Sequence, residues 1–217
     1  MYNMTINEII VTEVKGMPRA LTEHEKEQIK IKLLEVAENQ MFNVGIKKIT
    51  VDDLVKGAQI AKGTFYLFYE NKERLFYEVF RLRHDEIQGR FITDLSNCTL
   101  PLSADKLTGL IYNLCESLDQ SFIFSLAKRG DLELLMRKIP ESLLTEHIEK
   151  DDLSIKKLLT LFPHIEDPRI EVYSAAFRIA LISIMHKNEV GAFAFNEALK
   201  LTLKGIIVQM MEENSHD

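Results

Sequence analysis

The sequence contains few of the residues that break helices or cross-link chains. Its 217 residues include nine glycines, five prolines and two cysteines, and no tryptophan. β-Sheet proteins need many tight turns, which glycine and proline supply, so their scarcity favours an all-α protein. Cys98 and Cys115 belong to no CxxC or metal-binding pattern. We expect them to be small apolar side chains in a reducing compartment rather than a disulfide.

Long apolar runs and enzyme motifs are also absent from the sequence. No segment is long and apolar enough to span a bilayer, so we expect a cytoplasmic protein with no membrane partner. The six histidines form no H-x-x-x-H or H-E-x-x-H pattern, and the only E-x-x-H motif is Glu213 to His216. There is no G-x-G-x-x-G, P-loop or nucleophile elbow. We therefore expect no metal, no cofactor and no enzymatic activity.

The net charge of -6 is unevenly distributed along the chain. Residues 1–74 contain 11 basic and 11 acidic side chains, whereas residues 75–217 contain 16 and 22. Between Lys47 and Arg74 there are six cations and four anions. This mild local excess of positive charge is consistent with contact to phosphate groups.

Helix start signals divide the chain into elements. Thr22 with Glu25, and Thr50 with Asp53, each form a capping box, in which side chain and backbone satisfy each other at a helix N-terminus. Asn71 is a third N-cap of a helix. Residues 1–20 form an extension before the first cap. The expected helices cover residues 22–45, 51–57, 61–67, 71–91, 107–118, 168–185 and 192–213, with a turn at 58–60, a loop at 93–101 and breaks at Gly130, Pro140 and Asp151–Asp152.

The C-terminal helices have apolar residues on all sides. A helix of this kind must be buried on two sides, so one side packs on the chain's own core and the other needs a partner. Four large apolar side chains in this half either belong to that core or line a ligand pocket: Phe122, Phe124, Met136 and Phe177.

The segment Ala58–Phe76, AQIAKGTFYLFYENKERLF, combines aromatic rings with lysines. Two short helices, a tight turn and a cationic, ring-rich second helix describe a helix-turn-helix. One face of residues 61–69 would pack on the first two helices through its rings. The other face would meet phosphates and base edges through lysine, threonine and tyrosine.

Three stretches resemble the DNA-binding signature of TetR-type transcriptional regulators. They are Thr50-Val51-Asp52-Asp53-Leu54, Lys62-Gly63-Thr64-Phe65-Tyr66 and Tyr69-Glu70-Asn71-Lys72-Glu73-Arg74-Leu75, within residues 22–80. The resemblance implies a three-helix DNA-binding domain over residues 21–70 and a helical effector-binding and dimerisation domain over residues 71–217. By position it implies that the DNA contacts are Thr50, Lys62, Gly63, Thr64, Tyr66 and Lys72. It also implies a homodimer, for which we expect an interface at Phe177, Ile184, Leu199, Leu203, Ile206 and Met210.

The sequence departs from the family pattern at three positions. Gln59 occupies the turn position that usually holds glycine, where a left-handed backbone costs a residue with a Cβ about 1 kcal/mol or more. Ala61 replaces the serine that usually caps the recognition helix, so we expect no side-chain cap there. Met41 stands where the family usually has phenylalanine.

The resemblance implies a ligand-responsive transcriptional regulator, and we expect a repressor rather than an activator. As a dimer it would place two recognition helices about 34 Å apart on near-palindromic double-stranded DNA. A small apolar or amphipathic effector would move the helix that begins at Asn71 and so weaken DNA binding. The alternatives are a helical protein-interaction adaptor and a metal-carboxylate enzyme, although the enzyme would need paired E-x-x-H motifs inside helices.

Overall fold

The computed structural model describes residues 21–99, 101–145 and 167–212, and these residues form helices without any strand. The first four helices are α1 (Glu23–Asn43), α2 (Val51–Ala58), α3 (Lys62–Phe65) and α4 (Lys72–Ser96). The next are α5 (Ala104–Asp119), α6 (Phe122–Lys128) and α7 (Asp131–Met136). After the second gap come α9 (Asp167–Ser183), the 3₁₀ turn η2 (Ile184–His186), α10 (Lys187–Gly191) and α11 (Phe195–Glu212).

The predicted helix starts in the N-terminal part are confirmed. The hydroxyl of Thr22 accepts a hydrogen bond from the amide of Glu25, whose carboxylate accepts one from the amide of Thr22. Thr50 and Asp53 form the same reciprocal pair at α2, and the Asn71 side chain accepts from the amide of Arg74 at α4. These short-range hydrogen bonds satisfy backbone donors that have no partner within the helix.

Other element boundaries differ from the prediction. The loop expected from residue 93 is wrong in its first part, because α4 continues to Ser96. The hydroxyls of Thr93 and Ser96 donate to the carbonyls of Gly89 and Ile92 within the helix, so these polar residues do not end it. The last helix begins at Phe195, since residues 192–194 form a turn. The break at Gly130 is confirmed, whereas the extension 1–20 and the break at residues 151–152 lie outside the described residues.

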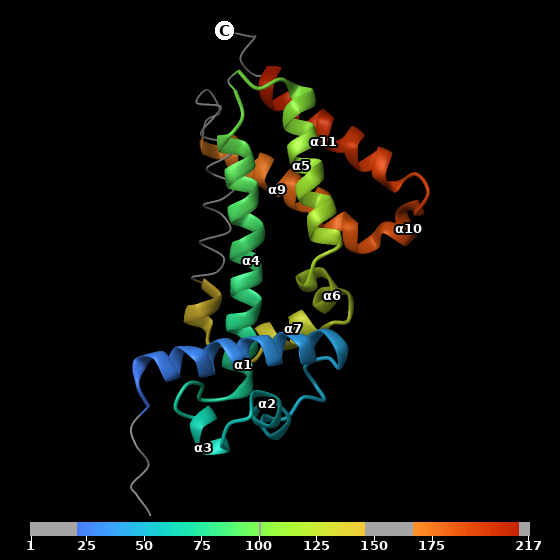
Figure 1. Cartoon of the computed structure of the whole chain (residues 1–217). Helices are drawn as coiled ribbons and strands as arrows, with labels where there is room; N and C mark the ends of the chain where they lie inside the picture. Colours follow the sequence, from blue (N-terminus) through green and yellow to red (C-terminus); the bar gives the residue numbers. More distant parts are fainter. Residues whose placement is uncertain (1–20, 100, 146–166, 213–217) are drawn as a thin grey trace, which may run out of the picture.

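The helices enclose two hydrophobic cores. The first lies among α1, α2, α3 and the N-terminal half of α4, and α6 and α7 also pack on it. The second lies among α5, α9 and α11. Figure 1 shows α4 as the long helix that connects the two ends of the molecule, and its residues Phe91 and Leu95 pack against the second core. A displacement of α4 therefore affects both cores.

Within the described ranges, no helix combines the length and apolarity needed to cross a bilayer. That part of the chain also brings no three His, Cys, Asp or Glu side chains together as a metal site would require. Cys115 is buried in the second core, and burial raises the pKa of its thiol to about 12. It therefore behaves as a small apolar core residue, as the sequence predicts.

Candidate nucleic-acid interface and cavity

The turn between α2 and α3 keeps a left-handed residue although it has no glycine. Gln59 has φ 58° and ψ 43°, and its amide donates to the carbonyl of Lys56 at 3.3 Å. The following amide, that of Ile60, donates to the carbonyl of Val55 at 3.0 Å. These two bonds close α2 in the way that a C-terminal glycine usually permits. The turn keeps its geometry, and the backbone of Gln59 is strained.

The nearby glycine, Gly57, serves a different purpose. A Cβ at this position would lie 2.6 Å from Cγ1 of Val36, which is far inside van der Waals contact. The missing side chain therefore allows α2 to pack closely against α1. The crossing of these two helices fixes the support on which α3 rests.

The single turn of α3 separates an inward ring from an outward face. Phe65 is completely buried, and its ring lies edge-on to that of Tyr66 with centroids 5.4 Å apart. Tyr66 is 51% exposed, and Lys62 and Gly63 are also exposed. Ala61 precedes the helix without a side-chain cap, as expected. A Cβ added to Gly63 would meet no atom of the protein within 4 Å, so the space outside this residue is open.

The two lysines expected to bind phosphate both hold internal partners. Lys62 Nζ lies 2.9 and 3.0 Å from the carboxylate oxygens of Asp52 on α2, and this hydrogen bond raises the pKa of the lysine. Lys72 is half-buried, and its Nζ donates to the carbonyl of Ile49 at 2.5 Å. Ile49 immediately precedes the cap of α2. Both lysines therefore stand beside the N-terminal part of α2, near the exposed Thr50.

Sequence reasoning missed some exposed residues in this region. Lys47 and Lys48 are exposed in the connection between α1 and α2, directly before the capping box. Leu67 is an exposed apolar residue beside Tyr66. A pair of lysines next to a helix start was the available signal for the first two. Nothing in the pattern distinguished Leu67 from a core leucine.

The corner between α6 and α7 is attached to the end of α1. Arg129 donates to the carbonyls of Met41 and Phe42 at 2.7 and 2.5 Å, and its Nε lies 3.4 Å from the buried carboxylate of Asp131. A Cβ at Gly45, where φ is +81°, would lie 3.0 Å from the same carboxylate. This contact satisfies carbonyls that have no partner within α1 and joins the N-terminal helices to the C-terminal half.

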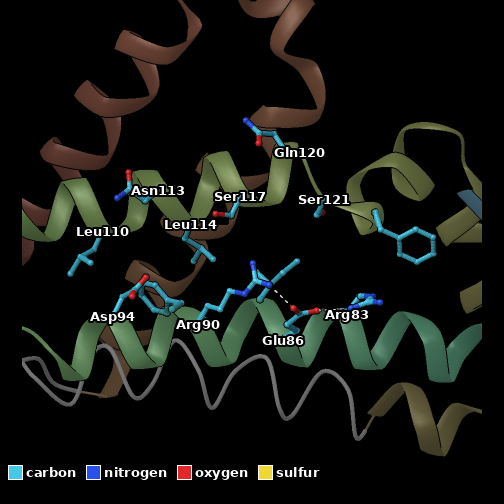
Figure 2. Close-up of a pocket in the computed structure, with 13 residues that line it drawn as sticks. Arg83, Glu86, Arg90, Asp94, Leu110, Asn113, Leu114, Ser117, Gln120 and Ser121 are labelled. Carbon is cyan, nitrogen blue, oxygen red and sulfur yellow. Dashed lines mark hydrogen bonds and ion pairs between the residues drawn. The ribbon is translucent and has the colours of Figure 1, made fainter. Parts of the chain in front are cut away.

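A cavity of about 360 Å³ lies between α4, α5 and the start of α6 (Figure 2). Its apolar lining consists of Ile87, Phe91, Leu110, Leu114 and Phe122, and its charged lining consists of Arg83, Glu86, Arg90 and Asp94. Of the four expected ligand residues, only Phe122 lines it. Phe124 and Phe177 belong to the second core, and Met136 packs against the first. The charged residues of α4 were missed because charges on a long helix usually indicate a solvated face.

The charges beside this cavity form a chain that begins on α1. Arg83 holds both carboxylate oxygens of Glu38 at 2.6 Å and one oxygen of Glu86 at 2.8 Å. Glu86 is also paired with Arg90. Hydrogen bonds from the two arginines lower the pKa of Glu86, and bonds to the two carboxylates raise the pKa of Arg83. These ion pairs link Glu38 on α1 to the lining of the cavity.

The residues expected at a dimer interface lie mostly inside the single chain. Five of them fill the second core: Phe177, Ile184, Leu199, Leu203 and Met210. Ile206 is half-buried against the same core. This placement corrects the expectation that they face a partner. The exposed apolar side chains of α9 and α11 are instead Val172, Ile179, Ile182 and Leu201.

Comparison with known proteins agrees with the helix-turn-helix. The profile of the bacterial regulatory proteins of the tetR family matches residues 33–79. The HTH-type transcriptional repressor KstR2 of Mycolicibacterium smegmatis is 34% identical over 87 residues, covering 40% of this chain and 42% of that protein. The uncharacterized HTH-type transcriptional regulator YuxN of Bacillus subtilis is 29% identical over 133 residues, covering 58% and 44%. The chain thus spans less than half the length of these relatives.

Solved structures extend the likeness to the whole fold. A TetR-family transcriptional regulator from Mesorhizobium loti superposes with a TM-score of 0.61 at 17% identity, covering 88% of this chain and 98% of that one. Thermus thermophilus FadR, a TetR-family repressor solved with lauroyl-CoA, gives 0.56 at 16% identity, covering 84% and 93%. At these identities the likeness concerns the fold alone. Together with the matched DNA-binding segment and its relatives, this fold supports a TetR-family transcriptional regulator.

Proposed function

We propose that this protein is a repressor that binds double-stranded DNA through α2 and α3 as a homodimer and is released by a small-molecule effector. One observation carries the proposal. The buried ring of Phe65 anchors a one-turn helix whose other face exposes Lys62, Gly63 and Tyr66 beside Thr50. An anchored helix with an open polar face suits insertion into the major groove.

The internal partners of the lysines are compatible with DNA contact. Lys62 and Asp52 form an exposed surface pair, and such pairs contribute little to stability, so a phosphate can replace the carboxylate. Lys72 is held beside the N-terminus of α2, where backbone amides and the helix dipole attract anions. At Gly63 the open space permits close approach of a DNA backbone.

A homodimer would cover the exposed apolar residues of α9 and α11. Ile179 and Ile182 are 69% and 57% exposed, and Leu201 on the neighbouring α11 is also exposed. Covering such a surface with a second copy removes apolar area from water. A two-fold dimer would present two copies of α3 to the half-sites of a near-palindromic operator.

An effector would act through α4, which contacts both cores. The cavity between α4 and α5 has a volume in the range of small-molecule sites. The fold is compatible with such a ligand, because FadR of Thermus thermophilus was solved with lauroyl-CoA. Effector binding would shift α4 and change the spacing of the two recognition helices.

The test is a mobility-shift titration against DNA upstream of the protein's own gene, at several salt concentrations between about 50 and 200 mM. Lys62→Ala should weaken binding and reduce the slope of log affinity against log salt by about one, because one phosphate contact is lost. Lys106→Ala is the matched control, since Lys106 is an exposed lysine on α5. A protein-interaction adaptor predicts no shift, and equal slopes for the two variants would contradict the role of Lys62.

A further inference from the structure

Of the two arginines that line the cavity, Arg90 has more unused hydrogen-bond donors than Arg83. Its side chain is 72% exposed, and in the described part of the chain its partner is Glu86. Figure 2 shows Arg90 extending between α4 and α5, with Leu114 across from it. A guanidinium has five N–H donors in a planar fork, so this pairing leaves donors available to a ligand in the cavity that Arg90 lines.

The other charged groups at this end of the cavity are already engaged. Arg83 binds two carboxylates, and Glu86 accepts from two arginines. At this end of the cavity the remaining capacity is therefore that of a donor, which suits an anionic head group and not a cation, whereas the carboxylate of Asp94 lies at the other end, on the side of Leu110 (Figure 2). The apolar side chains Phe91, Leu110 and Leu114 lie on the facing helices α4 and α5. They suit an apolar body attached to that head group.

Glu86 is the point at which such a ligand would be sensed. It is shared between Arg83 and Arg90, so an anion that occupies Arg90 competes with it. Glu86 released from Arg90 would pair with Arg83 alone, and Arg83 would then hold Glu38 less tightly. Because Glu38 belongs to α1, this sequence of exchanges reaches the helix on which α2 and α3 are mounted.

We propose that the cavity binds an amphipathic molecule with an anionic head group at Arg90, and that the chain Glu86–Arg83–Glu38 transmits its presence to α1. The proposal deepens the proposed function, because it names the class of effector and the route of its action. The proposal has two parts that can be tested separately. The class of ligand follows from the residues that line the cavity, and the route to α1 follows from the ion pairs.

The ligand class is tested by calorimetric titration of the full chain with decanoate, decanol and decylamine, which share one alkyl chain and differ in head-group charge. Decanoate should bind at least about tenfold more tightly than the other two, as expected for a lost charge-assisted hydrogen bond. Arg90→Gln should weaken decanoate binding by about tenfold or more. Equal binding of decanol, a preference for decylamine, or no binding of decanoate would overturn the proposal.

Arg137→Gln is the matched control. Arg137 is 73% exposed and pairs with Glu133 one turn earlier at 2.5 Å, as Arg90 pairs with Glu86, but it lies outside the cavity. This variant should bind decanoate like the wild type. Equal losses in the two arginine variants would mean that surface charge, and not the cavity, decides binding.

The route is tested by amide hydrogen exchange in α1, which does not require DNA. Decanoate should speed exchange in α1 by about fivefold in the wild type, in line with typical allosteric couplings. In Glu38→Gln it should still bind, because Glu38 does not line the cavity, but it should cause no further change in α1. An unchanged α1 in the wild type would overturn the route. A protein that responds in this way and binds no operator DNA would refute the proposed function alone.

Discussion

The strained residue Gln59 offers a direct test of the helix-turn-helix geometry. Its backbone is left-handed, with φ 58° and ψ 43°, and it is the only residue other than glycine with positive φ in the described ranges. The side chain is exposed, so its replacement removes little packing. Gln59→Gly should therefore stabilise the protein, because glycine adopts this conformation without a steric penalty.

The expected gain follows from two opposing effects. The left-handed conformation costs a residue with a Cβ about 1–2 kcal/mol. The glycine itself lowers the stability by about 0.5–1 kcal/mol, because its backbone loses more conformational freedom on folding than that of other residues. The net gain is about 0.5–1 kcal/mol. A change of 1 kcal/mol moves the midpoint by about 2–4 °C in a chain of this size, so Tm should rise by about 1–4 °C.

Thermal unfolding followed by circular dichroism would measure this rise. Gln59→Ala is the control, since alanine shortens the side chain and retains the Cβ, and its Tm should not increase. Gln59→Asn should fall between them, because asparagine tolerates the left-handed region better than glutamine. A lower Tm for Gln59→Gly, or an equal rise for Gln59→Ala, would show that the backbone strain is not what limits stability here.

Other substitutions test the remaining parts of the structure. Gly57→Ala should lower the free energy of unfolding in urea by about 1–2 kcal/mol, because its Cβ would overlap Val36. Adding Val36→Ala should restore part of the lost stability. An unchanged stability of Gly57→Ala would contradict the close α1–α2 crossing. Ile182→Asp should dissociate the proposed dimer in sedimentation velocity with its helix content kept, whereas Phe177→Asp should unfold the second core. If the Ile182→Asp variant is still a dimer, the outer face of α9 is not the interface. Hydrogen bonds from Thr50, the N-cap of α2, hold the pKa of the Asp53 carboxyl below its usual 3.8. The ionised carboxylate therefore stabilises the fold fully above pH 3.8, and this stabilisation is lost as the pH falls through the lower pKa of the folded state. Asp53→Asn should therefore lose stability at neutral pH and approach the wild type in acid, and a stability difference independent of pH would argue against this role.

The N-terminal helices could be predicted because their signals are local. A capping box such as Thr50 with Asp53 places its hydrogen-bonding groups three residues apart, so the spacing alone identifies the helix start. The buried role of Phe65 could be predicted too, since a one-turn helix with rings and lysines must direct its rings to the support. The end of α4 was harder to predict. Thr93 and Ser96 are polar residues that suggest a loop, but their hydroxyls donate to carbonyls within the helix.

The inner face of α9 could not be predicted in the same way. Its apolar residues occur on all sides, so periodicity does not distinguish Phe177, which is buried, from Ile179, which is exposed. The packing of α9 against α5 and α11 decides between them, and this is a property of three helices far apart in the sequence. For the same reason nothing in the sequence marks Arg90, which the structure places opposite the apolar residues Leu110 and Leu114 of α5.

Two polar contacts hold the C-terminal part of α1 against the helices that follow the helix-turn-helix. Arg129 holds the carbonyls of Met41 and Phe42 at the end of α1, and Arg83 holds Glu38 about one turn earlier. The first contact lies outside the cavity, whereas the second belongs to the chain of ion pairs that reaches it. Under the proposed route, an anion that loosens Glu38 leaves the end of α1 attached, and the ion pair of Lys30 with Glu78 still joins the earlier part of α1 to α4. Because α2 and α3 share a core with α1, a small shift of α1 at Glu38 would be passed to the recognition helix, and a coupling of about 1–3 kcal/mol would be enough.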